Sequence, residues 1–278
     1  MKETIKIYHI LGITILLLIS NAVFPQAKQR IISLAPSLTH NLILLGIQDQ
    51  IVGITNYCEN NADESISIVA SAIDVNIEKV ASMRPDLVVA TSLTNPEVKT
   101  SLKNLGIELV YFPLPKSFEE INSQFLELGK MVNREETALR IVKRERNKVE
   151  ALKRMIPEGN ATKKIFVEIG TKPLFCVIPN TFLDDYITLV GGINATADLN
   201  NGMISREGVL VRNPDVIVLA TMGNVGDEEK SNWMNYSSVN AVKTKDIYMI
   251  DSDIACSPTP DHFTHTLELF FKFLYGKK

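Results

Sequence analysis

Short apolar runs and helically spaced apolar positions alternate along most of the chain. Residues 30–34, 87–89 and 216–218 are continuous runs rich in β-branched side chains, which are typical of buried strands. Residues 118–132 instead place apolar side chains three to four positions apart, as on one face of a helix. Strands that alternate with helices are typical of parallel sheets with crossover helices. The pattern therefore predicts an α/β fold.

One unit of this pattern occurs twice in the chain. Residues 76–89 align with residues 205–218 without a gap, so that Glu78 matches Glu207. In both copies a capping residue opens a short helix with an acid in its first turn, and a Pro-Asp pair precedes an apolar run. Flanking strands also correspond in order: 30–34 with 164–169, and 108–112 with 247–250. Such units are common by chance, but the shared order favours two equivalent lobes.

A segment of different character separates the two copies. Residues 134–155 are dense in charge, contain neither glycine nor proline, and space their apolar residues as a helix does. At about 1.5 Å of rise per residue, this helix would be roughly 33 Å long. We expect a helical linker over 118–156, including one long rigid helix, between lobes at 30–113 and 163–278. The alternative is a helix that belongs wholly to one lobe.

The first residues of the chain have the pattern of a secretory signal peptide. Two lysines precede an apolar run at residues 10–19, and small residues follow at 20–22. The run is shorter than a membrane-spanning helix, although a retained anchor is an alternative. We expect a signal peptide over 1–22, with cleavage as late as residue 27, and export to a periplasm. The first cysteine is Cys58, so no lipoprotein anchor is predicted.

Composition and charge narrow the function further. The chain has 278 residues, of which 45% are hydrophobic and 22% are charged, as in soluble globular proteins of about two domains. The net charge of −3, without a basic block, argues against a nucleic-acid partner. No nucleophile elbow or phosphate-binding loop is present in the sequence. We expect a monomer that is not an enzyme.

Several motifs resemble those of the helical-backbone substrate-binding proteins, the periplasmic receptors of ABC importers for cobalamin, ferric siderophores and haem. These motifs lie at residues 31–39, 45–46, 52–58, 76–88, 190–194 and 205–215. The residues of these motifs are most similar to those of the cobalamin receptors. The resemblance implies two Rossmann-like lobes with a ligand cleft between them. It also implies delivery of the ligand to a membrane permease dimer with a cytoplasmic ATPase.

The resemblance implies a docking role for Glu78 and Glu207, because acids at these places in such receptors contact arginine pockets on the two permease subunits. One carboxylate per lobe would meet a symmetric dimer at two points, and Arg–carboxylate pairs are bidentate and orienting. The favourable field at a helix N-terminus explains a single acid equally well. The recurrence of the acid in both copies of the repeat favours docking.

Ligand-binding residues are expected where loops reach the cleft. Tyr57 follows the second strand of the first lobe, where it could stack on a flat macrocycle, donate a hydrogen bond or ligate ferric iron. A buried core tyrosine is the alternative. The turn with Pro36 and Ser37 should lie beside it, and the loop from Asp253 to Cys256 should face it from the second lobe. The predicted ligand-binding residues are Pro36, Ser37, Tyr57, Cys58, Asp253, Cys256 and His262.

The cysteines and the last histidines offer further chemistry. By the resemblance, Cys58, Cys176 and Cys256 could border the cleft, whereas buried inert thiols are the alternative. Asp261, His262 and His265 open the last predicted helix. Histidines three positions apart share a helix face and could contact metal or haem, although polar first turns are common. We predict no resident metal or cofactor.

Two departures from the resembled family concern the ligand. Its cobalamin receptors carry tryptophans six residues before each docking acid, where this chain has Ala72 and Asn201. Its only tryptophan, Trp233, is expected in a polar loop, so aromatic packing would come from Phe112, Phe175 or Trp233 itself. His40 also stands where the family usually has Glu. We expect the ligand to be a cobalt corrinoid such as cobalamin, with a ferric siderophore or haem as the alternative. A chelatase-like enzyme, rather than a receptor, is the third hypothesis.

Overall fold

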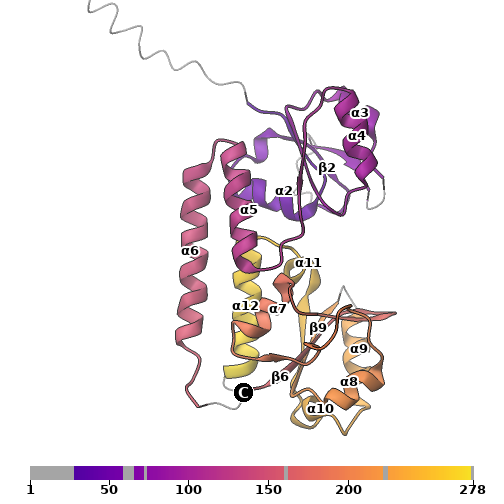
Figure 1. Ribbon diagram of the computed structural model, residues 1–278, viewed down its shortest axis with the longest axis vertical. Coiled ribbons are helices and arrows are strands. Elements are labelled where there is room, and N and C mark those ends of the chain that lie inside the picture. Colours follow the sequence, from indigo (N-terminus) through magenta and orange to yellow (C-terminus); the bar gives the residue numbers. More distant parts are fainter. Residues whose placement is uncertain (1–27, 59–65, 72–73, 160–161, 222–224, 277–278) are drawn as a thin grey trace, which may run out of the picture.

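Two lobes lie one above the other beside a group of long helices (Figure 1). The computed structural model describes residues 28–58, 66–71, 74–159, 162–221 and 225–276. The predicted signal peptide and Ala72 lie outside these residues. Each lobe has its own largely parallel sheet with crossover helices, so the predicted α/β fold with two lobes is confirmed.

The sheet of the first lobe has five parallel strands in the order β3-β2-β1-β4-β5. The strands are β1 (Ile31–Ser33), β2 (Ile51–Thr55), β3 (Ser67–Ala70), β4 (Leu87–Thr91) and β5 (Leu109–Phe112). The helices around it are α2 (Pro36–Leu44), η1 (Gln48–Gln50), α3 (Ile77–Ser82) and α4 (Pro96–Asn104). Ile31 and Val89 pack into one core, and Ile32 and Val88 pack into another on the opposite face. Burial on both faces explains why these strands are continuous apolar runs.

The second sheet has the order β10-β9-β6-β7, with β8 beside β6. Its strands are β6 (Lys164–Thr171), β7 (Leu174–Cys176), β8 (Ile193–Asn194), β9 (Val216–Thr221) and β10 (Ile247–Asp251). The strand β7 runs antiparallel to β6, whereas the other strand pairs of this sheet are parallel. Only residues 172–173 connect the two strands, and a connection this short permits only an antiparallel return.

The helices of the second lobe include one that the sequence pattern did not reveal. They are α7 (Phe182–Thr188), α8 (Arg206–Arg212), α9 (Val225–Met234), α10 (Asn240–Thr244), α11 (Ser252–Ala255) and α12 (Pro260–Tyr275). Trp233 lies on α9 and is fully buried, so its expected place in a polar loop was wrong. The few apolar residues in this stretch leave no helical periodicity to detect, although the large indole of Trp233 is fully buried.

Two consecutive helices connect the lobes along the chain. These are α5 (Phe118–Met131) and α6 (Glu135–Arg154), separated by a turn in which Asn133 has a left-handed φ of 55°. The 20 residues of α6 make it about 30 Å long. α12 lies beside both helices, and together the three form a spine along the lobes (Figure 1).

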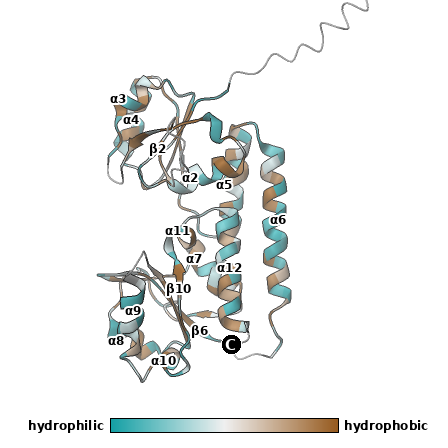
Figure 2. Ribbon diagram, turned by 180° about the vertical axis from the view of Figure 1, so that it is seen from behind, coloured by the Kyte–Doolittle hydropathy of each residue, from teal (hydrophilic) through white to brown (hydrophobic). Residues whose placement is uncertain are grey.

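This spine belongs to the cores of both lobes. Phe118 of α5 packs in the core of the second lobe, whereas Phe125, two turns later, packs in that of the first. Val142 and Val149 divide α6 between the two cores in the same way. The side of α6 that faces away from the lobes is largely hydrophilic, in contrast to the hydrophobic strands β6 and β10 (Figure 2). The lobes are therefore coupled through shared packing as well as through covalent linkage.

Glu145 marks the middle of the spine. Its side chain is fully buried on α6 and accepts a hydrogen bond from Thr264 of α12. Lys148 and Arg144, on the same helix, form ion pairs with this carboxylate. A buried carboxylate is costly unless it is paired and hydrogen-bonded, as it is here. The contact fixes the register between α6 and α12 where the two lobes meet.

Candidate functional site

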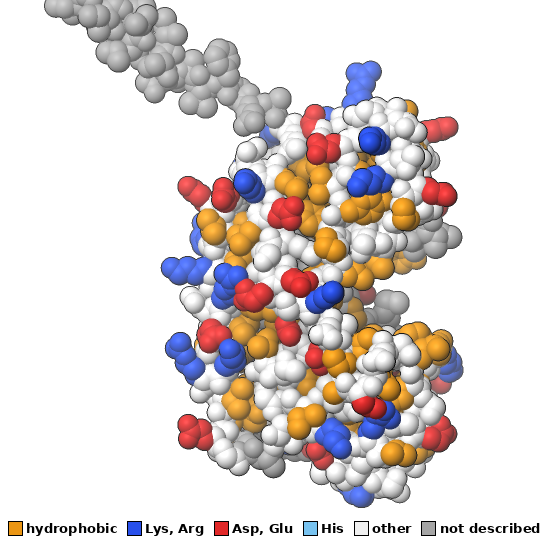
Figure 3. Space-filling model, in the orientation of Figure 1, with side chains coloured by type: hydrophobic (Ala, Val, Ile, Leu, Met, Phe, Trp, Pro, Cys, Tyr) orange, Lys and Arg blue, Asp and Glu red, His pale blue; other side chains and the backbone are white. Residues whose placement is uncertain are grey.

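A hollow separates the two lobes on the side opposite α6, and hydrophobic side chains border it on both lobes (Figure 3). Helix α2 follows the carboxyl end of β1, and α11 follows the carboxyl end of β10. These two helices face each other across the space between the lobes (Figure 1). Ligands of open α/β sheets bind outside the carboxyl ends of the strands, so this hollow is the candidate binding site.

The turns after the strands of the first lobe carry several exposed side chains. Tyr57 follows β2, and 62% of its surface is exposed, which excludes the alternative of a core tyrosine. Pro36, the first residue of α2, is exposed as well, whereas Ser37 beside it is nearly buried. Leu93, in the turn after β4, is 76% exposed and was missed by the sequence reasoning. The only signal for it is an apolar residue within a polar turn at a strand end.

Cys58, unlike the preceding Tyr57, does not lie at the surface. Its side chain is buried, and its sulfur lies 3.1 Å from the hydroxyl of Thr39 and 3.3 Å from that of Thr55. These contacts attach the loop that carries Tyr57 to helix α2. Contact between Cys58 and a ligand stays a prediction. Cys176 is also buried, in β7, and burial raises the pKa of its thiol.

In the second lobe, Asp253 lies on α11 and Cys256 directly after it, and both are exposed. The carboxylate of Asp251 caps α11 by accepting the backbone N–H of Asp253 at 2.8 Å, and this orients the loop. Surrounding protein atoms desolvate the Cys256 thiol, and with the negative charge of Asp253 they raise its pKa to about 11. The thiol is therefore neutral near pH 7, which makes it a weak hydrogen-bond donor rather than a thiolate ligand.

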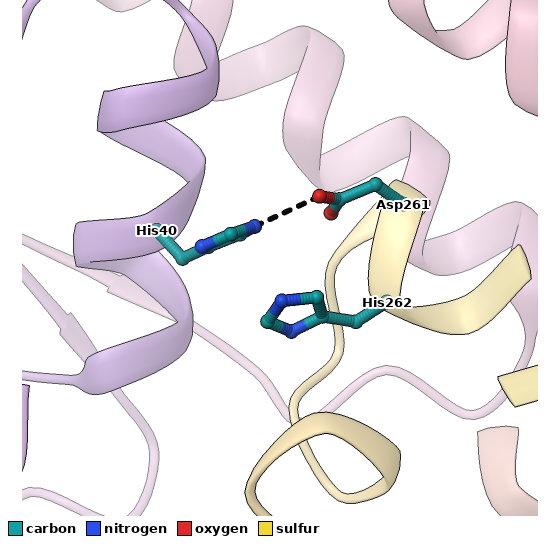
Figure 4. Close-up of side chains that lie close together, drawn as sticks. All are labelled: His40, Asp261 and His262. Carbon is teal, nitrogen blue, oxygen red and sulfur yellow. Dashed lines mark hydrogen bonds and ion pairs between the residues drawn. The ribbon is translucent and has the colours of Figure 1, made fainter. Parts of the chain in front are cut away.

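A group of three side chains connects the lobes at the start of α12 (Figure 4). Nε2 of His40, on α2, lies 2.9 Å from Oδ2 of Asp261, on α12. The rings of His40 and His262 lie 4.0 Å apart between centroids. His265 is exposed and lies outside this group. Hence the structure brings His262 together with His40 of the other lobe, and not with His265 on its own helix.

The environment of Asp261 keeps its carboxylate ionised. Burial alone would raise its pKa, but the hydrogen bond and positive charge of His40, together with His262 and the Thr259 hydroxyl, hold the pKa well below its usual range. Oδ1 accepts a hydrogen bond from Thr259 at 2.9 Å, while Oδ2 faces His40. Each carboxylate oxygen thus has a separate partner, one from its own loop and one from the opposite lobe.

The two predicted docking acids lie far from this hollow. Glu78 is exposed in the first turn of α3, and Glu207 is exposed in the first turn of α8. The two helices lie at opposite ends of the molecule (Figure 1). Asn76 caps α3 by accepting the N–H of Lys79 at 2.9 Å, and Ser205 caps α8 by accepting the N–H of Gly208 at 3.1 Å.

The Pro-Asp pairs of the repeat also have the same role in both lobes. Asp86 accepts the backbone N–H of Arg30 at 2.7 Å, and Asp215 accepts that of Lys164 at 2.9 Å. Each aspartate therefore ties the end of its helix to the first strand of its own lobe. The residue before each proline is left-handed, with a φ of 46° in both cases. This shared geometry places the two acids equivalently on the two lobes.

A buried polar network behind α8 was not predicted from the sequence. Arg206 forms an ion pair with Glu229, and its guanidinium lies 4.6 Å from the centre of the Trp233 ring. The indole N–H donates a hydrogen bond of 2.8 Å to Glu168. Burial of Glu168, with a further contribution from Glu229, raises the pKa of Glu168 to about 8. Trp233 is part of this network and is fully buried, and Phe112 is buried as well. Of the three aromatic residues expected to pack against the ligand, Phe175 is the one that is partly exposed, at 37%.

Within the described part of the chain, no helix is both long and apolar enough to span a membrane. Residues 31–254 match the family model described as periplasmic binding protein. The chain belongs to this family, whose members are solute-binding proteins.

Three similar proteins illustrate the range of the family. The vitamin B12-binding protein of Yersinia pseudotuberculosis serotype O:1b (strain IP 31758) is 30% identical over 225 residues, which cover 79% of this chain and 80% of that protein. The crystal structure of a possible iron-binding (periplasmic solute-binding) protein from Staphylococcus epidermidis ATCC 12228 has a TM-score of 0.79 and 25% identity, over 90% of this chain and 100% of that one. The periplasmic heme-binding protein HutB of Vibrio cholerae has a TM-score of 0.79 and 17% identity, with coverage of 90% and 100%.

Proposed function

We propose that this protein is the receptor of an ABC importer that captures a corrinoid in the hollow between its lobes and delivers it to a membrane permease. The observation that carries the proposal is the pair Tyr57 and Leu93, which are large, exposed and placed after β2 and β4, the two parallel strands on either side of β1. A corrinoid already coordinates its own metal, so the protein needs to supply only apolar walls and a few polar groups. The identity with a vitamin B12-binding protein supports the same ligand class.

Haem is the second candidate, and one observation favours it. The phenol of Tyr57 is accessible, and phenolate is a known axial ligand of haem iron. A ferric siderophore would use the same walls without an axial ligand from the protein. The two metal macrocycles therefore differ in what they require of Tyr57: a corrinoid needs the ring for stacking, whereas haem iron needs the hydroxyl.

Two substitutions of Tyr57 separate these ligands. The chain without its signal peptide is titrated with cyanocobalamin and with hemin, by calorimetry and by absorption in the Soret region. We expect a cyanocobalamin isotherm that Tyr57→Ala weakens and Tyr57→Phe leaves nearly unchanged, because the phenylalanine retains the stacking ring. Absence of cyanocobalamin binding, together with a haem spectrum that both substitutions abolish, would replace the corrinoid by haem. Tyr248→Phe is the control, since this tyrosine stacks on Phe273 within the second lobe.

The same proposal assigns Glu78 and Glu207 to docking on two subunits of a permease dimer with a cytoplasmic ATPase. Their exposure, their equivalent placement in the two lobes and their position at opposite ends of the molecule support this role. A receptor held at two distant points presents its ligand hollow to the axis between the two subunits.

Export through a cleaved signal peptide completes the proposal. The lysines, apolar run and small residues of the first 22 positions support it, as does the periplasmic binding protein family of the chain. N-terminal sequencing of the protein recovered from a periplasmic extract tests it. A mature chain that begins between residues 23 and 28 is expected, and a chain that retains residues 1–22 would contradict cleavage.

A further inference from the structure

The three side chains that connect the lobes have the composition of a metal site. His40, Asp261 and His262 each offer one ligand atom, and these three atoms lie within 4.8 Å of one another. The two imidazoles and the carboxylate come from both sides of the space between the lobes (Figure 4). We propose that they bind a divalent transition-metal ion, of which Zn²⁺ and Co²⁺ are representatives, and that the ion bridges the two lobes. This inference does not rest on the identity of the transported ligand.

The donor set selects the class of metal. Imidazole nitrogens suit Zn²⁺, Co²⁺, Ni²⁺ and Cu²⁺, whereas Ca²⁺ and Mg²⁺ require many more oxygen ligands than one carboxylate supplies. Zinc sites with three protein ligands keep one position for water or another small ligand. Side-chain exposures of 29% for His40 and 25% for Asp261 leave a route for the ion to enter.

The geometry requires only a small adjustment. Metal–ligand bonds of about 2.0–2.2 Å place neighbouring ligand atoms of a tetrahedral site roughly 3.3 Å apart. Nε2 of His40 and Oδ2 of Asp261 are already 2.9 Å apart, in a hydrogen bond that the ion would replace. The ring of His262 lies against that of His40, with 4.0 Å between centroids. Side-chain rotation can therefore close the site without movement of the lobes.

A supporting contact holds the carboxylate in the required orientation. Thr259 is fully buried and donates its hydroxyl hydrogen to Oδ1 of Asp261 at 2.9 Å. This hydrogen bond leaves Oδ2 directed toward the histidines. Ligating carboxylates in metal sites are held by such outer contacts, and their removal weakens metal binding by about 10–100-fold. Thr259→Val is therefore a test of the site that leaves all three proposed ligands in place.

The experiment uses the mature chain without a polyhistidine tag, cleared of metal with a chelator. Titration with Co²⁺, followed by visible absorption, reports both binding and coordination, and Zn²⁺ is then titrated by calorimetry. We expect a single ion per chain with a strong tetrahedral-type Co²⁺ spectrum. His40→Gln and His262→Gln should abolish this spectrum, and Thr259→Val should weaken binding by about 10–100-fold. The exposed His265, three residues further along α12, provides the matched control in His265→Ala, which should bind as the parent does.

Thermal unfolding with and without Zn²⁺ gives a second measurement for each variant. Because the shift is measured within one variant, a destabilised variant remains informative. Zn²⁺ should raise the unfolding temperature of the parent and of His265→Ala, but not that of His40→Gln. Absence of Co²⁺ binding by the parent would reduce the group to a hydrogen-bonded contact between the lobes and overturn the proposal. Retention of parental Co²⁺ affinity by His40→Gln would also overturn it.

Discussion

Helices α3 and α8 begin in the same way but are held by different means. Both have a polar cap, an exposed acid in the first turn, a buried valine two residues after the acid and an aspartate that ties them to a strand. Behind α8, Arg206 is paired with the nearly buried Glu229 and stacked on Trp233. Among the described residues, α3 takes part in no ion pair; Lys79 instead donates to the carbonyl of Ile68.

This difference shows that a repeated motif can determine where an acid lies without determining how strongly its helix is held. The local signals of cap, acid, proline and aspartate determine where the acid lies on each lobe. They do not determine how strongly the helix is held, because that depends on what the rest of the lobe places behind it. In the second lobe the residue before the acid is the half-buried arginine Arg206, whereas in the first it is the apolar Ile77.

The largest effect is expected when the network behind α8 is broken. Arg206→Ala leaves Glu229 buried without its cation, and losing one partner of a buried ion pair costs about 3–5 kcal/mol. The free energy of unfolding, from denaturant titration, measures this loss. Arg212→Ala is the control on the same helix, because its partner Asp198 is exposed, and only a small loss is expected there. Equal losses for both substitutions would remove the distinction between the helices.

Docking is expected to depend on both acids. Glu78→Ala and Glu207→Ala should each weaken association with the permease by about 30-fold or more, because each leaves an arginine without its carboxylate. Ligand affinity should stay near the parental value, since both acids lie far from the hollow. Glu97→Ala and Glu228→Ala are controls, as both replace exposed acids in the first turns of α4 and α9. Loss of ligand binding with normal permease association would contradict the docking role.

Glu168 should make the second lobe sensitive to pH. Its pKa is raised to about 8 in the folded protein from an ordinary 4.5, so the folded state holds its proton more tightly than the unfolded state does. Stability contributed by this group is therefore lost as the pH rises from about 4.5 to about 8. Glu168→Gln keeps an acceptor for Trp233 but cannot ionise.

We expect Glu168→Gln to gain stability over the parent by roughly 2 kcal/mol as the pH rises from about 6 to about 8. Denaturant titrations of both proteins across this range measure the difference in unfolding free energy. A difference that does not change with pH would show that Glu168 keeps an ordinary pKa. The comparison cancels the contributions of all other titrating groups that the substitution leaves unaffected.

The smallest expected effects are those of the caps. Asn76→Ala and Ser205→Ala each remove one hydrogen bond to a helix N-terminus, at a cost of about 0.5–2 kcal/mol. Amide hydrogen exchange should show a larger increase in α3 than in α8, because Arg206 still anchors α8 when its cap is gone. Equal increases in the two helices would mean that the anchor adds nothing to local stability.

Much of the architecture follows from sequence because its signals are local. Buried parallel strands leave apolar runs, and helix ends leave caps and prolines, so both sheets and the equivalence of Glu78 with Glu207 were predictable. The exposure of Tyr57 also followed from its position after a strand. The lobe boundaries at 30–113 and 163–278 stay a prediction, as does the ligand contact of each predicted site residue.

What sequence could not provide are contacts between distant residues. His40 and Asp261 are 221 positions apart, and their contact depends on how α2 of one lobe is placed against α12. Trp233 was misplaced because its burial depends on Arg206 and Glu168, neither of which is near it in the chain.

The packing of α5 and α6 in the cores of both lobes makes the proposed receptor a bivalent binder of fixed span. After one acid has docked, the second contact is intramolecular, so its effective concentration depends on how well the distance between the acids matches that between the two subunits. A flexible joint between the lobes would lower that concentration by spreading the distance over many values. Conversely, a permease that changes the spacing of its two subunits during transport would break this match and release the emptied receptor.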